Sequence, residues 1–267
     1  MSKLKVLITG GNGFIAKFLS TNLNYEIVSP PRSELDLLNL EQVTDWFDNN
    51  EIDIVIHCAL TGREVLFSTE PVYLSDGLLM FRNLWLQKAK FKRLINLGTA
   101  YELDITRPNN LVNEYDFLNH LPTTSYGYSK NLIARIIQDT SNFYNLKLFG
   151  VFHETENQKR FFQRVKNDPE VVIENDIYLD YMYLPDIIPM ICTIAEGYSQ
   201  HRDINMVYPN KYCLSQLAYI LCTHLNLPTD KIKVINSSGN NLTGNSSVLE
   251  SYKFDLIGID QGLRNYK

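Results

Sequence analysis

The chain has 267 residues, 45% of them hydrophobic and 21% charged, which is typical of a folded globular protein and excludes general disorder. Its formal net charge of -5 repels nucleic-acid phosphates and anionic membrane surfaces, so we expect neither partner. No apolar run approaches the ~20 residues needed to span a bilayer, and we expect no signal peptide.

Short apolar runs alternate with longer amphipathic segments through the first half of the chain. The predicted strands are 5–9, 26–29, 53–58, 94–97 and 146–152, and the predicted helices are 14–24, 40–49, 78–88 and 129–143. Strands and helices in alternation are typical of a parallel sheet with crossover helices on both faces. We therefore predict an α/β protein with a doubly wound parallel sheet, the Rossmann arrangement.

A glycine-rich turn, TGGNGFIA, follows the first predicted strand. Gly10 permits the tight turn, and Gly13 lets the backbone approach a pyrophosphate. The helix that starts with Phe14 and Ile15 offers backbone N–H groups and its positive dipole to the phosphates. Ala16 stands in place of a third glycine, where any small residue allows close packing of helix on strand. We predict a dinucleotide site here.

The residues after the second predicted strand indicate which dinucleotide is bound. NAD-selective sites have an acidic side chain at this point, but here the chain continues as PPRS, with Arg32 and Ser33. A guanidinium and a hydroxyl suit a 2′-phosphate, so we predict NADP(H), although Arg32 could also be a solvated loop cation. Asp36, followed by Leu37, could lie near the adenine amino group or cap the helix that begins near Asn39.

The glycine-rich turn, the RSELDL stretch and the YGYSK segment together resemble the extended short-chain dehydrogenase/reductases, the NAD-dependent epimerase/dehydratase family. The nucleotide-sugar branch, which includes 4-ketosugar reductases and the GDP-fucose synthase type, is most similar. The resemblance runs from Lys3 to about Asp186 and resumes weakly at 262–266. It implies a nucleotide-sugar substrate and a homodimer.

Tyr126 and Lys130 form the Tyr-x-x-x-Lys pair of this resemblance. Four residues apart at the start of a helix, they face the same side. We expect the Lys130 ammonium to lower the phenol pKa of Tyr126 from about 10, which would favour proton exchange with a substrate oxygen. The resemblance implies that Lys130 also holds the nicotinamide ribose. It further implies that Thr99 hydrogen-bonds the reacting oxygen.

Departures from the family pattern restrict the types of reaction that we expect. Dehydratases of this branch follow the active-site Thr with Asp-Glu, whereas Thr99 is followed by Ala100 and Tyr101. The GDP-fucose synthase type has an acid/base Cys where this chain has Tyr101, so epimerisation lacks one expected group. His57 replaces the usual small or amide residue beside the cofactor.

We therefore predict NADPH-dependent reduction of a keto group on a nucleotide-activated sugar, a 4-ketosugar reductase of deoxysugar or polysaccharide precursor biosynthesis. The alternatives are a nucleotide-sugar 4-epimerase and a non-catalytic protein that senses NADP. Epimerases of this type usually keep NAD, which the absent acid after the second strand disfavours. A sensor has no need of the Tyr126 and Lys130 pair.

The pattern becomes less regular after Phe152, where polar residues and prolines interrupt the apolar segments. We predict a dinucleotide-binding Rossmann domain at 1–152 and a smaller, mainly substrate-binding portion at 153–267, with some segments returning to the Rossmann core. Helices are expected at 214–225 and 248–254. Arg160 is a candidate for binding a diphosphate, although a surface helix cation explains it about as well.

Two further expectations concern assembly and compartment. The helices at 78–88 and 129–143 have more apolar positions than one sheet-facing stripe requires, which predicts a homodimer. These positions include Leu79, Phe81, Leu84, Ile133, Ile136 and Ile137. The four cysteines have no Cys-x-x-Cys or zinc-ligand spacing, so we expect free thiols, no metal and a cytoplasmic location.

Overall fold

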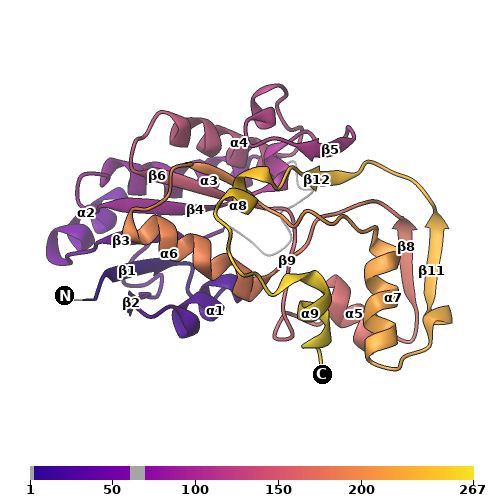
Figure 1. Cartoon of the computed structure of the whole chain (residues 1–267). Helices are drawn as coiled ribbons and strands as arrows, with labels where there is room; N and C mark the ends of the chain where they lie inside the picture. Colours follow the sequence, from indigo (N-terminus) through magenta and orange to yellow (C-terminus); the bar gives the residue numbers. More distant parts are fainter. Residues whose placement is uncertain (1–2, 61–69) are drawn as a thin grey trace. The chain divides into compact units, whose positions relative to one another are not determined.

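The computed structural model describes residues 3–60 and 70–267, which form two compact units (Figure 1). Unit 1 comprises the described residues of Met1–Asp104 together with Tyr115–Lys147 and Met190–Ile204. Unit 2 comprises Ile105–Glu114, Leu148–Pro189 and Asn205–Lys267. Each unit is therefore built from segments that are distant in the sequence.

A parallel sheet organises unit 1, and among the described residues it has six strands in the order β10-β6-β4-β3-β1-β2. The strands are β1 (Lys5–Thr9), β2 (Glu26–Val28), β3 (Ile54–His57), β4 (Arg93–Thr99), β6 (Phe143–Leu148) and β10 (Asp203–Met206). The strand order changes direction between β1 and β3, which is the doubly wound arrangement. The predicted α/β fold with a parallel sheet is confirmed.

Helices cover this sheet. They are α1 (Phe14–Asn22), α2 (Leu40–Asn49), α3 (Pro71–Leu86), α4 (Ser125–Gln138) and α6 (Ile188–Glu196). The hydrophobic core on one face joins Trp46 of α2, Phe81 of α3 and Ile137 of α4 to Leu7 and Leu94 of the sheet. Figure 1 shows α1 and α6 on the other side. None of the described helices is long and apolar enough to cross a membrane.

Several element boundaries differ from the predicted ones for local reasons. α3 begins at Pro71, earlier than predicted, because proline fits the first position of a helix. α4 begins at Ser125, because the Thr124 side chain accepts the N–H of Gly127 at 3.1 Å. Phe143, predicted as the last residue of that helix, is instead the first residue of β6.

Unit 2 consists of short strands and helices, and its described residues form three two-stranded parallel sheets, β8/β11, β5/β12 and β7/β9. The strands are β5 (Asn109–Val112), β7 (Val151–Phe152), β8 (Val171–Asn175), β9 (Met182–Tyr183), β11 (Ile232–Asn236) and β12 (Leu242–Gly244). The helices are α5 (Phe161–Asn167), α7 (Leu214–His224), α8 (Ser247–Ser251) and α9 (Gly258–Arg264). Helix α7 packs against α5 and α9. The strand predicted at 146–152 is divided between β6 and β7.

Candidate active site

The glycine-rich turn lies between β1 and α1, at the point where the strand order changes direction. Gly10 has a φ of +70°, and a Cβ there would come within 2.8 Å of the Ala59 backbone after β3. The Gly13 N–H donates to the Gly10 carbonyl at 2.8 Å, and α1 follows directly with Phe14 and Ile15. The turn therefore brings bare backbone to a helix start, which fits the phosphates of a dinucleotide.

Thr9 ties the end of β1 to the end of β3 beside this turn. Its hydroxyl oxygen accepts the N–H groups of Cys58 at 3.2 Å and Ala59 at 3.3 Å, and lies 2.9 Å from Nδ1 of His57. Burial, assisted by the charge of Lys130, lowers the pKa of His57 to about 3. His57 is therefore a neutral imidazole, and its hydrogen bond with the Thr9 hydroxyl helps to hold the two strand ends together.

Arg32 and Ser33 follow β2 and are both exposed. The Arg32 side chain is 72% exposed, and its Nε lies 3.1 Å from Oδ2 of Asp36. The other Asp36 oxygen accepts the Leu38 N–H at 3.0 Å, so Asp36 orders this turn. Helix α2 is capped instead by Asn39. The cap role considered for Asp36 is therefore wrong, because Asn39 directly precedes the first helical residue.

Leu37 lies in the hydrophobic core rather than on the surface of the turn. Its carbonyl accepts a hydrogen bond from the buried side chain of Asn83 at 2.8 Å. The Asn83 side chain therefore anchors the segment after β2 to α3. A contact between Leu37 and the cofactor stays a prediction.

The structure brings three predicted catalytic residues together in unit 1. Tyr126 and Lys130 lie on the first turns of α4, and Thr99 is the last residue of β4. Each of the three is 7% exposed. The Thr99 side chain acts on the Tyr126 phenol and lowers its pKa, and Lys130 Nζ donates to the Leu97 carbonyl at 3.0 Å. A hydroxyl, a phenol and an ammonium therefore occupy one small region at the carboxyl end of β4.

The ionisation of this site differs from the expectation. Burial raises the pKa of Tyr126 and outweighs the lowering by the Thr99 side chain, while Glu102 and Tyr101 add smaller rises. The expected lowering of the Tyr126 pKa by Lys130 is therefore wrong. Lys130 Nζ bonds the Leu97 carbonyl instead, and burial lowers the pKa of Lys130 itself.

Glu102 belongs to the surroundings of this site, and the sequence reasoning missed it. Its side chain accepts the Thr99 N–H at 3.0 Å, while the Thr99 hydroxyl accepts the Tyr101 N–H at 3.3 Å. This is a capping box at the start of the short 3-10 turn Ala100–Glu102. The Thr-x-x-Glu spacing that follows β4 is the signal that could have identified it.

Arg160, the candidate diphosphate residue, lies in unit 2 at the start of α5. Its Nε lies 2.8 Å from Oε2 of Glu156, and its guanidinium also donates to the Val151 carbonyl. Oε1 of the same glutamate accepts the Tyr266 hydroxyl at 2.8 Å. Arg160 thus has a structural role that links β7, α5 and the last residues, and its binding of a diphosphate stays a prediction.

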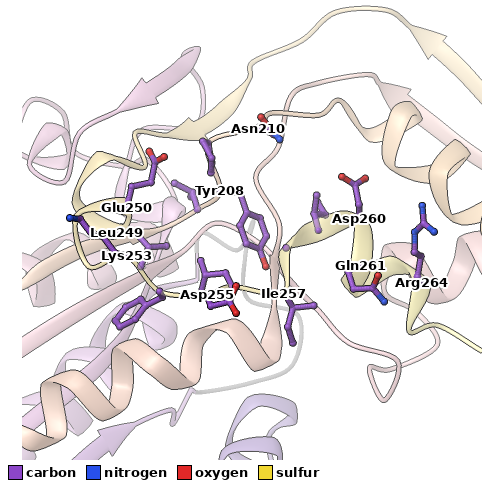
Figure 2. Close-up of a pocket in the computed structure, with 16 residues that line it drawn as sticks. Tyr208, Asn210, Leu249, Glu250, Lys253, Asp255, Ile257, Asp260, Gln261 and Arg264 are labelled. Carbon is purple, nitrogen blue, oxygen red and sulfur yellow. The ribbon is translucent and has the colours of Figure 1, made fainter.

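Unit 2 also contains a surface pocket of about 690 Å³, and none of the predicted catalytic residues lines it (Figure 2). Two cations, Lys253 and Arg264, lie at opposite ends of the pocket, as Figure 2 shows. Three carboxylates, Glu250, Asp255 and Asp260, also line it. Because carboxylates outnumber cations, the pocket is a poor match for a diphosphate.

Within 3–60 and 70–267, no group of three or more His, Cys, Asp or Glu side chains is arranged to hold a metal ion. The cysteines of the described chain are free thiols. Cys58, which precedes Ala59 at the end of β3, is half-buried, and desolvation raises the pKa of its thiol to about 12. The Cys58 thiol is therefore uncharged at neutral pH.

Comparison with known proteins gives a family match. The model described as the NAD dependent epimerase/dehydratase family matches residues 6–206. GDP-L-colitose synthase of Yersinia pseudotuberculosis is 23% identical over 245 residues, covering 80% of this chain and 79% of the relative. GDP-L-fucose synthase of Azorhizobium caulinodans is 29% identical over 161 residues, covering 49% and 51%.

Solved structures share the fold. GDP-mannoheptose C4 reductase from Campylobacter jejuni, solved with NADP bound, has a TM-score of 0.84 at 16% identity, covering 100% of this chain and 98% of its own. The dTDP-4-dehydrorhamnose reductase from Bacillus anthracis, in complex with NADP, has a TM-score of 0.80 at 19% identity, with coverage of 100% and 98%. At these identities the likeness shows the fold.

Proposed function

Since the chain belongs to the NAD dependent epimerase/dehydratase family and is an oxidoreductase of the extended short-chain dehydrogenase/reductase type, we propose that it reduces a 4-keto group on a nucleotide-activated sugar with NADPH. The observation that carries the proposal is the burial of Thr99, at the end of β4, together with Tyr126 and Lys130, which lie one helical turn apart on α4. The names of the relatives, which include GDP-sugar synthases and a C4 reductase, support the substrate class.

The proposed chemistry divides between the cofactor and the chain. NADPH, when bound, supplies a hydride to the carbonyl carbon of the sugar. The Tyr126 phenol donates its proton to the carbonyl oxygen as negative charge develops there, which gives the alcohol. Thr99 directs its hydroxyl at the same oxygen and stabilises that charge. Lys130 holds its ammonium near the ribose of the nicotinamide and helps to orient the proton donor, Tyr126.

The protonation state of Tyr126 suits a proton donor. Because burial raises the pKa of Tyr126, the phenol stays protonated near neutral pH and serves as an acid. Oxidation of a sugar hydroxyl, the first step expected of a 4-epimerase, requires the phenolate as a base. A 4-epimerase re-reduces its keto intermediate with the same phenol as acid, so a substrate assay, and not this pKa, separates the two activities.

The proposed cofactor site is the turn after β1 with the segment after β2. Gly10 and Gly13 present the backbone to the pyrophosphate, and the start of α1 at Phe14 and Ile15 faces it. Arg32 and Ser33 are exposed where a 2′-phosphate would lie, and the Arg32 side chain is paired with the Asp36 carboxylate. NADP in the relatives' structures supports this choice of cofactor.

Arg32→Ala should weaken NADPH binding about ten- to a hundredfold, which corresponds to the loss of a charge-assisted contact worth about 1.5–3 kcal/mol. NADH affinity should stay the same, because NADH has no 2′-phosphate. Fluorescence titration of both cofactors provides the measurement. Lys90→Ala, which breaks a comparable surface ion pair with Asp48, is the matched control and should change neither affinity. Equal weakening of NADPH and NADH would show that Arg32 does not read the phosphate.

We also propose a homodimer, although the structure reduces the apolar surface that suggested it. Phe81, Leu84, Ile133 and Ile137 are buried within the chain, and Leu79 is half-buried. The exposed apolar residues of α3 and α4 are Val72, Leu86 and Ile136. A dimer through these helices should give twice the mass of 30.9 kDa by light scattering at micromolar concentration. Replacement of Leu86 and Ile136 together by Glu should yield the monomer, and a monomeric wild-type protein would refute the dimer.

A cytoplasmic location is part of the proposal and is supported by chemistry. The free thiols of the described chain suit a reducing compartment. Nucleotide-activated sugars and NADPH would be supplied there.

The experiment that tests the proposed function is a scan of purified protein against GDP- and dTDP-linked 4-ketosugars while NADPH absorbance is followed. A reductase consumes one NADPH per sugar. A 4-epimerase would instead interconvert the C4 epimers of GDP- or dTDP-linked 4-hydroxy sugars, added to the panel for this purpose, without net NADPH consumption. A cofactor sensor would bind NADPH without turnover. Either of the last two results on the full panel would reject the reductase.

A further inference from the structure

A cluster of polar side chains lies buried in unit 1 beneath the end of β4. Its members are Asn96 of β4, Glu102 of the 3-10 turn, Asn145 and Lys147 of β6, and Asp203 of β10. Each of them is at most 4% exposed. Burial of charged groups is costly unless they are paired and hydrogen-bonded, so a cluster of this kind demands an explanation.

The cluster is joined by hydrogen bonds but is not neutral when both acids are ionised. Asn145 Nδ2 lies 3.2 and 3.1 Å from the two Glu102 carboxylate oxygens and 3.1 Å from Asp203 Oδ1. Lys147 Nζ binds Asp203 directly and lies 3.8 Å from Glu102 Oε2. One ammonium therefore faces two carboxylates, and it lies closer to Asp203 than to Glu102.

Glu102 connects this cluster to the candidate active site. Its Oε1 accepts the Thr99 N–H at 3.0 Å, and the Thr99 side chain in turn acts on the Tyr126 phenol, whose pKa it lowers. The carboxylate also packs against the strand itself, since a Cβ on Gly98 would lie 2.4 Å from Glu102 Oε1. A shift of the Glu102 side chain would therefore move the backbone that holds the Thr99 hydroxyl.

The charge of Glu102 acts on the same groups. Burial lowers the pKa of Lys130, and Glu102 opposes that lowering, while Glu102 also contributes to the raised pKa of Tyr126. Burial raises the pKa of Glu102 to about 7, Lys147 lowers it and Asp203 raises it. The titratable groups that face Glu102 are thus Lys147 on β6, Asp203 on β10, and Tyr126 and Lys130 on α4.

We propose that Glu102 is a positioning residue of the active site, which holds the Thr99 backbone at the end of β4 and places its charge near Tyr126 and Lys130. The mechanistic part of this inference rests on the proposed reductase function. Lys147 of β6 and Asp203 of β10 influence the ionisation of Glu102: Lys147 lowers its pKa and Asp203 raises it. The alternative is that the cluster only joins β4, β6 and β10. The two hypotheses differ in whether a neutral side chain at position 102 would change kcat and its pH dependence.

Glu102→Gln keeps the size of the side chain and an oxygen for the Thr99 N–H, but removes the charge. Thermal stability and NADPH affinity should stay close to wild type, while kcat falls about tenfold with KM unchanged. The alkaline limb of the kcat profile should move to lower pH by about one pH unit, because loss of a negative charge lowers the pKa of both Tyr126 and Lys130. Asp180→Asn is the matched control, since Asp180 is a buried carboxylate in unit 2 held by Lys211 and the Gly244 N–H, each at 2.8 Å.

A second measurement needs no substrate. Carbon NMR of lysine-labelled protein, with the Lys130 signal assigned by its loss in Lys130→Met, gives the pKa of Lys130. This pKa should be lower in Glu102→Gln than in wild type and unchanged in Asp180→Asn. If no ketosugar is reduced by the wild-type protein, the proposed function fails, yet this titration still decides whether Glu102 acts on Lys130.

Asp203→Asn keeps Glu102 and frees Lys147 to pair with it, so it serves if Glu102→Gln does not fold. Removing the like charge should lower the pKa of Glu102, and the pH dependence near neutrality should move to lower pH. The inference is overturned if Glu102→Gln keeps the wild-type kcat, alkaline limb and Lys130 pKa. It is also overturned if Asp203→Asn leaves the profile unshifted, which would leave the cluster a purely structural joint.

Discussion

Tyr126→Phe should lower the turnover of a 4-ketosugar by about 10²–10⁴-fold, the contribution ascribed to a positioned acid. The change removes one hydroxyl and keeps the aromatic ring in its buried place, so the fold and NADPH affinity should survive. Single-turnover reduction in a stopped-flow instrument, beside a direct NADPH titration, measures both quantities.

Tyr128→Phe is the matched control for this variant. Tyr128 lies on the same helix, two residues further on, and therefore points away from the side that Tyr126 and Lys130 share. Tyr128→Phe should leave turnover and NADPH affinity unchanged. Near-normal turnover in Tyr126→Phe on a true substrate would remove the proposed acid, and a cofactor-sensing role would become the better interpretation.

Lys130→Met should lower turnover and NADPH affinity together, turnover by about 10²-fold or more and affinity by about tenfold. Methionine fills the buried space of the lysine stem but has neither charge nor donor, so the contact to the Leu97 carbonyl is lost as well. The same single-turnover and titration measurements apply. Lys92→Met, which removes an exposed lysine paired with Asp53, should change neither quantity.

An unchanged NADPH affinity in Lys130→Met would contradict the ribose role. In that case Lys130 would act on the reaction only through the phenol. A loss of NADPH affinity without a loss of turnover at saturating NADPH would contradict the role of Lys130 in the reaction itself.

Local pattern was enough to predict the central part of the fold. The apolar runs at 5–9 and 53–58 became neighbouring parallel strands, and the glycine-rich turn follows the first of them as expected. The Tyr126 and Lys130 pair could be found because both residues lie on one helix at a spacing with a chemical reason. The element boundaries were less accurate, since caps such as Thr124 outweigh hydrophobic periodicity.

Features that depend on long-range contacts could not be predicted. The pKa of Tyr126 is governed by burial, which no local pattern gives, so the expected lowering was wrong. Glu102 meets Lys147 and Asp203 only through the order of the strands in the sheet. The pairing of Arg160 with Glu156, by contrast, has the i, i+4 spacing that sequence reasoning could have used.

The central claim is that this chain transfers a hydride from NADPH to the keto carbon of a nucleotide-activated sugar while Tyr126 supplies the proton. NADPH deuterated at the transferable position, incubated with the protein and a GDP-linked 4-ketosugar, tests it most directly through mass and NMR analysis of the product. The account predicts one deuterium on the former carbonyl carbon, one NADPH oxidised per sugar, and a fall of about 10²–10⁴-fold in the rate of both in Tyr126→Phe. A product without deuterium, or deuterium transfer at the wild-type rate in Tyr126→Phe, would contradict it.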